Sequence, residues 1–233
     1  MASSMTFKDV VSLPRDNLGP DTIPVLIDRY KSLRLEGLRV DPSAFGSNYE
    51  REIKFTHDDW LRRLTNPLVR TFVSLDFLSD AHSGSISASP GSDVLLGNEW
   101  LGMVSLAGPK ILPTAASHPL EPFRSSGITD PPDLTSIQGQ HVVYILVGMF
   151  VRPEHRRRGR GRRLVEAAMA AAEIEARRAS AKGITVALEV HSSNQAGYSL
   201  YQKLGFIDFT EVESGRLDVS TTCSMKWEKK FDA

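Results

Sequence analysis

Residues 142–163 read VVYILVGMFVRPEHRRRGRGRR and join an apolar run to a segment rich in arginine and glycine. Its first part, Val142–Val151, is an apolar run that suits a buried strand and is far shorter than the ~20 residues that a helix needs to cross a bilayer. An arginine- and glycine-rich loop follows, and a helical pattern then runs over Gly161–Ser180. A second apolar run, Ile184–His191, completes a strand-helix-strand unit, which predicts two parallel strands with the helix packed across them.

The other elements are predicted from apolar periodicity and from the residues that stop helices and strands. They are helices over Asp21–Arg39, His57–Leu64 and Asn194–Leu204, and strands over Thr6–Leu13, Arg70–Leu78, Glu99–Leu106, Phe206–Val212 and Ser220–Trp227. Thr56 and Asp59 have the spacing of a capping box at the start of the second helix. Residues 79–93 and 107–140 are rich in Ser, Gly or Pro and are predicted loop insertions, the longer one either a lid or a mobile insertion. Because no repeat or linker divides the chain, we expect one domain over residues 1–233, with its core motifs in 142–212.

The charges balance globally and concentrate locally. Lys and Arg number 28 and so do Asp and Glu, which excludes a generally basic nucleic-acid coat. Within residues 152–163, however, seven arginines face one glutamate, a balance of 7 − 1 = +6. The arginines are Arg152, Arg156, Arg157, Arg158, Arg160, Arg162 and Arg163. The single cysteine, Cys223, and the lack of a signal-like start favour a reducing compartment, so we expect a cytoplasmic location, with the nucleus as the alternative and no membrane partner.

The arginine loop has the features of an anion-binding site. A strand that passes through glycines into a helix leaves backbone N–H groups without partners at the positive end of the helix dipole. Gly159 and Gly161 would let this backbone approach a diphosphate, and neighbouring arginines could add bidentate contacts. A basic sorting or nucleic-acid patch and a merely solvated helix end remain alternatives, and the loop alone does not decide between them.

Two separate motifs resemble the GCN5-related N-acetyltransferase (GNAT) superfamily. The first is Arg156-x-x-Gly159-x-Gly161, which is similar to the family's Gln/Arg-x-x-Gly-x-Gly/Ala loop. The second is Asn194–Phe206, NQAGYSLYQKLGF, which resembles the family's Asn-x-x-Ala-x-x-Leu-Tyr-x-Lys-x-Gly-Phe run and has Gly197 at the alanine position. The resemblance implies an α/β (α+β) fold with a mixed, mostly antiparallel central sheet of about seven strands flanked by about four helices.

The resemblance also implies acetyl-coenzyme A (acetyl-CoA) as cosubstrate and assigns residues to it. The strand end at Met149, Phe150 and Val151 would pair with the pantetheine arm and polarise the thioester carbonyl. Asn194 would contact the pantetheine, and Tyr201 would stand beside the thioester sulfur. The diphosphate would lie on the loop residues Arg156, Arg157, Arg158, Gly159, Arg160, Gly161 and Arg162.

Two side chains are candidates for the catalytic proton transfers. Tyr201 could donate to the leaving thiolate, since a tyrosine hydroxyl stays protonated at neutral pH; its alternative role is a packed aromatic. Glu189 could take the proton of the attacking amine, and it resembles the glutamate of the branch that acetylates amino-terminal peptides. A strand-end carboxylate paired with a nearby arginine is the equal alternative. Whether Glu189 or a water chain is the base stays open.

The sequence therefore predicts an N-acetyltransferase that moves an acetyl group directly to a primary amine of a small molecule, an amino acid or a peptide amino terminus. A catalytically silent acyl-CoA sensor is the alternative, and a nucleic-acid-binding arginine loop ranks last. No cluster of ligands has metal-binding spacing, so we expect no metal. We also expect no nucleic-acid partner, and a monomer or homodimer. Acidic residues of the loop at 40–56, among them Asp41, Glu50 and Glu52, could attract a cationic amine.

Overall fold

A computed structural model of the chain describes residues 9–14, 19–76, 92–116, 118–128, 134–209 and 222–231. It divides into two compact units. The first comprises Met1–Ser105 and Gly148–Ala167, and the second comprises Leu106–Val147 and Ala168–Ala233. The expected single domain over residues 1–233 therefore stays a prediction.

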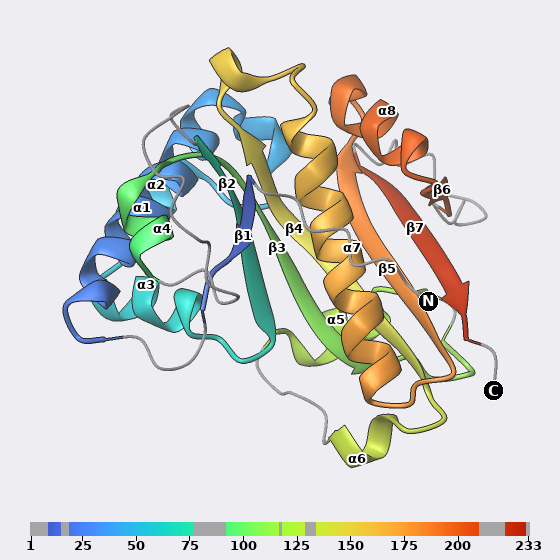
Figure 1. Cartoon of the computed structure of the whole chain (residues 1–233). Coiled ribbons are helices and arrows are strands. Elements are labelled where there is room, and N and C mark those ends of the chain that lie inside the picture. The colour runs from blue at the N-terminus through green and yellow to red at the C-terminus, as the bar shows by residue number, and fades with distance from the viewer. Residues whose placement is uncertain are drawn as a thin grey trace. The chain divides into compact units, whose positions relative to one another are not determined.

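The predicted mixed sheet is confirmed. It has seven strands in the order β1-β2-β3-β4-β5-β7-β6 (Figure 1). Their bounds are β1 Val10–Ser12, β2 Val69–Asp76, β3 Glu99–Ile111, β4 His141–Val151, β5 Gly183–His191, β6 Ile207–Asp208 and β7 Thr222–Lys230. β4 and β5 pair in parallel, as the strand-helix-strand pattern predicts, whereas β1–β2, β5–β7 and β6–β7 pair antiparallel. β3 and β4 each run from one unit into the other.

The first unit packs a group of helices around α1 (Thr22–Val40). α1 contacts α2 (Tyr49–Glu52), α3 (His57–Leu64) and α4 (Ser92–Gly97), as Figure 1 shows. Its apolar stripe is buried, with Leu26, Leu33 and Leu38 at most 1% exposed. The core that forms here also takes side chains from β2 and β3. The predicted capping box of α3 is present, because Thr56 and Asp59 exchange side-chain and backbone hydrogen bonds.

The second unit is organised by the long antiparallel pairing of β5 with β7, which extends from Gly183–Lys230 to His191–Thr222. The short helices α5 (Glu121–Ser126) and α6 (Leu134–Ile137) precede β4, and α8 (Gln195–Lys203) follows β5. Val142 and Ile184 are fully buried, as the apolar runs of these two parallel strands predict.

Helix α7 (Arg160–Arg178) starts in the first unit and continues into the second. Its buried face is built from Leu164, Val165 and small residues at helical spacing, among them Ala168 and Ala172. Small side chains let a helix approach a neighbouring backbone closely, so this face suits packing across a sheet.

Two boundary predictions are wrong. β3 continues to Ile111, through the start of the segment at 107–140 that we expected to be a loop, and α5 and α6 lie in the same segment. Gly108 and Pro109 suggested a break, yet Gly108 is needed in the strand, because a Cβ there would lie 2.8 Å from the Tyr144 ring of β4. Similarly, α4 begins at Ser92, inside the expected loop at 79–93, whose residues 79–91 lie outside the described part of the chain.

The described residues contain eight α-helices, more than the about four predicted. The difference lies in four short helices of six residues or fewer, α2, α4, α5 and α6. The four longer helices, α1, α3, α7 and α8, match the four that the sequence predicts. Short helices carry too little apolar periodicity to be recognised in a sequence.

Candidate functional site

The carboxyl end of β4 extends past its register with β5. The parallel register with β5 ends at Ile145–Ala187, so the last six residues of β4 lie beyond it. Gly148 has a φ of 66°, which bends the strand in a way that favours glycine. Met149 is half-buried, and Phe150 and Val151 are buried.

The loop after β4 presents a row of backbone N–H groups. Arg157 and Gly159 have positive φ angles of 63° and 75°, and α7 begins at the next residue. The first turn is closed by the Arg163 N–H, which donates to the Gly159 carbonyl at 3.1 Å. Among the described residues, the N–H groups from Arg157 to Arg162 have no backbone acceptor. Turn residues of alternating handedness before a helix form an anion-binding concavity of this kind.

Most of the loop's arginine side chains are already paired with carboxylates. The pairs are Arg152 with Glu36 and Glu99, Arg156 with Asp41, Arg160 with Asp9 and Asp76, Arg162 with Glu166, and Arg163 with Asp9. Arg157 and Arg158 are exposed and have no ion pair among the described residues. The structure thus corrects the expectation that the flanking arginines as a group are available for phosphate, since the six acids balance most of the local charge.

Asp9, just before β1, holds the start of α7. Its carboxylate accepts from Arg163 Nε at 2.9 Å and lies 3.5 Å from Arg160 Nη1. Arg160 also donates to the Ser74 hydroxyl and the Leu75 carbonyl of β2, both at 3.0 Å. Only 13% of the Arg160 side chain is exposed, so it anchors the loop to β1 and β2.

In the second unit, Tyr201 is a buried residue of α8. Its ring packs edge-on against Phe206 with a centroid distance of 5.7 Å. The hydroxyl has no hydrogen bond to any described residue. Burial raises the pKa of Tyr201 to about 12, so the phenol stays protonated throughout the neutral range.

Asn194 caps the amino end of α8. Its side-chain oxygen accepts from the Gly197 N–H at 2.9 Å. A Cβ at position 197 would lie 2.8 Å from the Asn194 amide nitrogen, so glycine at the family's alanine position fits this cap closely. The cap leaves the amide nitrogen of Asn194 without a hydrogen bond to a described residue.

Glu189 is exposed on β5 and forms an ion pair with Arg124 of α5 at 3.2 Å. The pairing shows that the segment at 107–140 reaches β5. Glu189 therefore has the arginine partner that the alternative to a catalytic base requires. The ion pair leaves both of the roles predicted for Glu189 open.

Sequence reasoning missed a cluster in the first unit formed by Arg34, Glu52 and Arg63. Glu52 was expected to be a surface acid, but it is fully buried and accepts a bidentate pair of hydrogen bonds from Arg34. Burial by itself would raise the pKa of Glu52, but Arg34, with smaller contributions from Ser47 and Arg63, outweighs it and holds that pKa below its usual value. The signal was available, because Arg34 lies between Tyr30 and Leu38 on the apolar stripe of α1.

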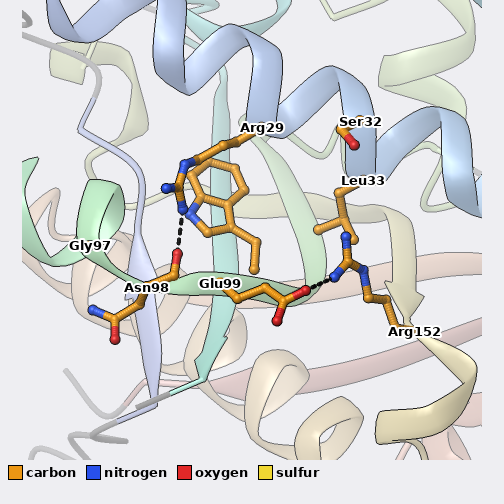
Figure 2. A pocket seen from close by; sticks show the side chains of 8 residues that line it. Arg29, Ser32, Leu33, Gly97, Asn98, Glu99 and Arg152 are labelled. Carbon is orange, nitrogen blue, oxygen red and sulfur yellow. Dashed lines mark hydrogen bonds and ion pairs between the residues drawn. The ribbon is translucent and has the colours of Figure 1, made fainter. Parts of the chain in front are cut away.

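The first unit also has a cavity of about 330 Å³, which does not include the predicted cofactor-binding residues (Figure 2). It is lined by Arg29, Ser32, Leu33, Gly97, Asn98, Glu99, Trp100 and Arg152. Both of its arginines are engaged, Arg29 with the carbonyls of Leu96 and Asn98 and Arg152 with Glu99 and Glu36. None of the predicted cofactor-binding residues lines it.

Two histidines at the ends of the parallel strands, His141 of β4 and His191 of β5, are hydrogen-bonded. His141 Nε2 is 2.8 Å from the Thr185 hydroxyl, and His191 Nδ1 is 2.7 Å from the Ser193 hydroxyl. In the described residues, no group of three or more His, Cys, Asp or Glu side chains could hold a metal ion. None of the described helices combines the length and apolar character needed to span a bilayer.

Comparison with known proteins gives a family match over part of the chain. Residues 132–208 match a family model described as an acetyltransferase (GNAT) domain. A search among curated proteins found no match. The matched residues contain both motifs, so the resemblance to the GNAT superfamily is confirmed, and the domain supports acetyl transfer as the general activity.

Several solved structures are similar to the chain at low identity. NAA60 of Arabidopsis thaliana, in complex with a bisubstrate analogue, has 13% identity over 96% of this chain and 99% of that one, with a TM-score of 0.48. A GNAT-family acetyltransferase from Streptococcus pneumoniae has 16% identity over the same shares, also at 0.48. The ribosomal-protein-alanine N-acetyltransferase of Brucella melitensis has 15% identity over 95% and 99%, at 0.44. Scores at this level establish neither fold nor function for this chain.

Proposed function

We propose that the protein is an N-acetyltransferase that transfers the acetyl group of acetyl-CoA directly to a primary amine. The acceptor is a small-molecule amine, an amino acid or a peptide amino terminus. One observation carries the proposal: inside the GNAT-matched residues, a strand end leads into a row of N–H groups that have no backbone acceptor among the described residues.

This row of N–H groups fits a diphosphate. Positive φ angles at Arg157 and Gly159 turn successive amides, and the helix dipole of α7 adds partial positive charge at the same place. The exposed Arg157 and Arg158 are free to add charge-assisted hydrogen bonds, whereas Arg156, Arg160 and Arg162 contribute through their backbone or through loop geometry. Asp9 keeps this geometry fixed, because it ties the first turn of α7 to β1.

When bound, acetyl-CoA supplies a thioester whose carbonyl carbon is attacked by the amine. We assign the backbone of Met149 and Val151 to the pantetheine arm and the thioester oxygen, where a fixed N–H stabilises developing negative charge. Phe150, between them, is 3% exposed and holds this part of β4 against the first unit's core. Asn194 is assigned to the pantetheine through its amide nitrogen.

Tyr201 is assigned to the departing sulfur. A thiol has an unperturbed pKa of about 8.5, whereas burial raises the pKa of Tyr201 to about 12. Complete proton transfer from the phenol to the thiolate is therefore uphill, and Tyr201 stabilises the developing charge by donating a hydrogen bond. Glu189 or a water chain takes the proton of the amine.

The proposal is tested by adding acetyl-CoA and then a panel of amines. Acetyl-CoA at about 100 times its Kd should stabilise the fold by about 2.7 kcal/mol, a rise in Tm of roughly 5–10 °C. Free thiol should then appear with at least one amine. In the variant R157Q/R158Q the affinity for acetyl-CoA should fall about tenfold, whereas R178Q, an exposed arginine at the other end of α7, should bind as tightly as the wild type. No stabilisation by acetyl-CoA would overturn the proposal.

A catalytically silent acyl-CoA sensor is the second candidate, and the Glu189–Arg124 ion pair favours it, because it engages the proposed base. The sensor binds acetyl-CoA without releasing thiol with any amine. Nucleic acid is not proposed as a partner, since six acids balance the arginine loop. The proposed binding partners are therefore acetyl-CoA and an amine. We propose that the protein is a monomer or a homodimer.

A further inference from the structure

In the buried cluster of the first unit, Arg34 donates from two of its three guanidinium nitrogens. Arg34 Nε and Nη2 donate to the two oxygens of Glu52 at 3.0 and 2.8 Å. Arg63 Nη1 and Nη2 donate to the same carboxylate at 3.0 and 3.3 Å. The Phe45 ring covers the Arg34 guanidinium at 4.6 Å, and only 9% of the Arg34 side chain is exposed. Arg34 is thus fixed in position by Glu52 and Phe45.

The remaining nitrogen of Arg34, Nη1, faces the bend of β4. It has no hydrogen bond to a described residue. A Cβ built on Gly148 would lie 3.6 Å from this nitrogen, and no other atom that is not adjacent in sequence lies within 4 Å of it. A side chain at position 148 would therefore contact Arg34 Nη1 first, and the N–H groups of this nitrogen border the strand at the glycine.

The charge of the cluster indicates what this space attracts. Two arginines and one glutamate leave a net charge of +1 next to Gly148. Of the acids that could have drawn in a cationic amine, Glu52 is held by the cluster and Asp41 pairs with Arg156, whereas Glu50 is exposed on the surface. A buried cation with a free N–H favours an oxygen acceptor, either a carboxylate or a carbonyl, and disfavours a second positive charge.

We propose that Arg34 determines acceptor specificity by donating from Nη1 to a carbonyl or carboxylate oxygen that lies close to the reacting amine. The acceptors selected are amino acids and peptide amino termini, in preference to alkylamines and polyamines. The inference rests on the proposed function. It places the acceptor beside Gly148, which precedes Met149, a residue assigned to acetyl-CoA.

The test compares matched acceptors in the wild type, R34Q, R34K and R63Q. Alaninamide and isopropylamine differ in the carboxamide, and spermidine adds a polycation; thiol release gives kcat/KM for each. Taking the alaninamide-to-isopropylamine ratio within each variant and comparing it across variants cancels the difference in amine reactivity. R63Q is the matched control, since it also removes one arginine from Glu52 but leaves Nη1 of Arg34 in place.

The wild type should prefer alaninamide, and R34Q should lower the ratio about tenfold or more, because a hydrogen bond from a charged donor is worth a factor of about ten to a hundred. R34K keeps a positive charge beside Glu52 but loses the forked guanidinium donor, so it should also lower the ratio. This variant keeps the test decisive if R34Q fails to fold. R63Q should lower Tm and leave the ratio unchanged. An equal ratio in the wild type and the Arg34 variants overturns the inference and leaves the proposed function intact.

Failure of the proposed function gives a different result. If acetyl-CoA is bound but no amine releases thiol, the inference is judged by binding of the product-like N-acetylalaninamide to the acetyl-CoA-free protein. Stabilisation of the wild type and R63Q, but not of R34K, supports the oxygen-binding role of Arg34. No stabilisation of any form overturns it.

Discussion

Tyr201 has a buried ring and a hydroxyl without a described partner. If this hydroxyl donates to the leaving sulfur, Y201F should lower kcat about 10- to 100-fold and change the Kd of acetyl-CoA little, because the hydrogen bond strengthens only as charge develops. Steady-state thiol release and calorimetric binding measure the two effects. An unchanged kcat would remove Tyr201 from this role and leave it a packed aromatic.

The raised pKa of Tyr201 also predicts how stability changes in alkali. The folded state keeps the phenol protonated up to about pH 12, whereas the unfolded chain ionises it near its usual value of 10. The contribution is therefore fully present below pH 10 and is lost as the pH rises from 10 to 12, by an amount of about 2–3 kcal/mol. Urea unfolding of the wild type and Y201F should show a shallower loss in the variant over this window.

Asp9 supports the arginine loop from a distant part of the chain, because it pairs with both Arg160 and Arg163. D9N should lower Tm by several degrees and weaken acetyl-CoA binding by a few-fold, since the first turn of α7 loses its anchor while the N–H groups stay intact. D58N is the control, because Asp58 is exposed and, among the described residues, its carboxylate pairs only with the neighbouring His57. Equal binding by D9N and the wild type would make Asp9 a purely structural residue.

At the scale of elements, α5 reaches β5 through the Arg124–Glu189 pair. Both side chains are largely exposed, so removing the pair should cost under about 1 kcal/mol of stability. If Glu189 is the base, E189Q should lower kcat at least about tenfold, whereas R124Q should leave kcat equal or raise it by freeing the carboxylate. If the pair is only structural, both variants keep the wild-type kcat, and a water chain becomes the base.

Elements with a local signal could be predicted from the sequence. α3 begins where Thr56 and Asp59 predict it, and β4 and β5 differ from their predicted bounds by one residue. β3 could not be bounded in this way, because Gly108 is explained only by its contact with Tyr144. Contacts between residues distant in sequence have no local pattern, whereas caps and apolar runs do.

The candidate site shows the same limit. Its motifs placed the strand end, the loop and α8 correctly, but they gave no sign that Asp9 and Asp41 neutralise the arginines, because these partners lie more than 100 residues away. The buried Arg34–Glu52 pair was missed for a related reason. Charged residues are assigned to the surface by default, because only an ion-pair partner offsets the desolvation free energy that their burial costs.

At the scale of the whole molecule, the chain is neutral and divides into two compact units, yet β3 and β4 belong to both. Unfolding one unit would break the hydrogen-bonded pairing of part of β3 and β4. It would also expose residues such as Val104 and Val143, which are fully buried. We therefore expect a single cooperative transition, in agreement with one domain over residues 1–233. Calorimetry should give equal van't Hoff and calorimetric enthalpies, and acetyl-CoA should move the whole transition upward. Two resolved transitions, with only one of them moved by acetyl-CoA, would show instead that the units fold independently and would contradict the single-domain prediction.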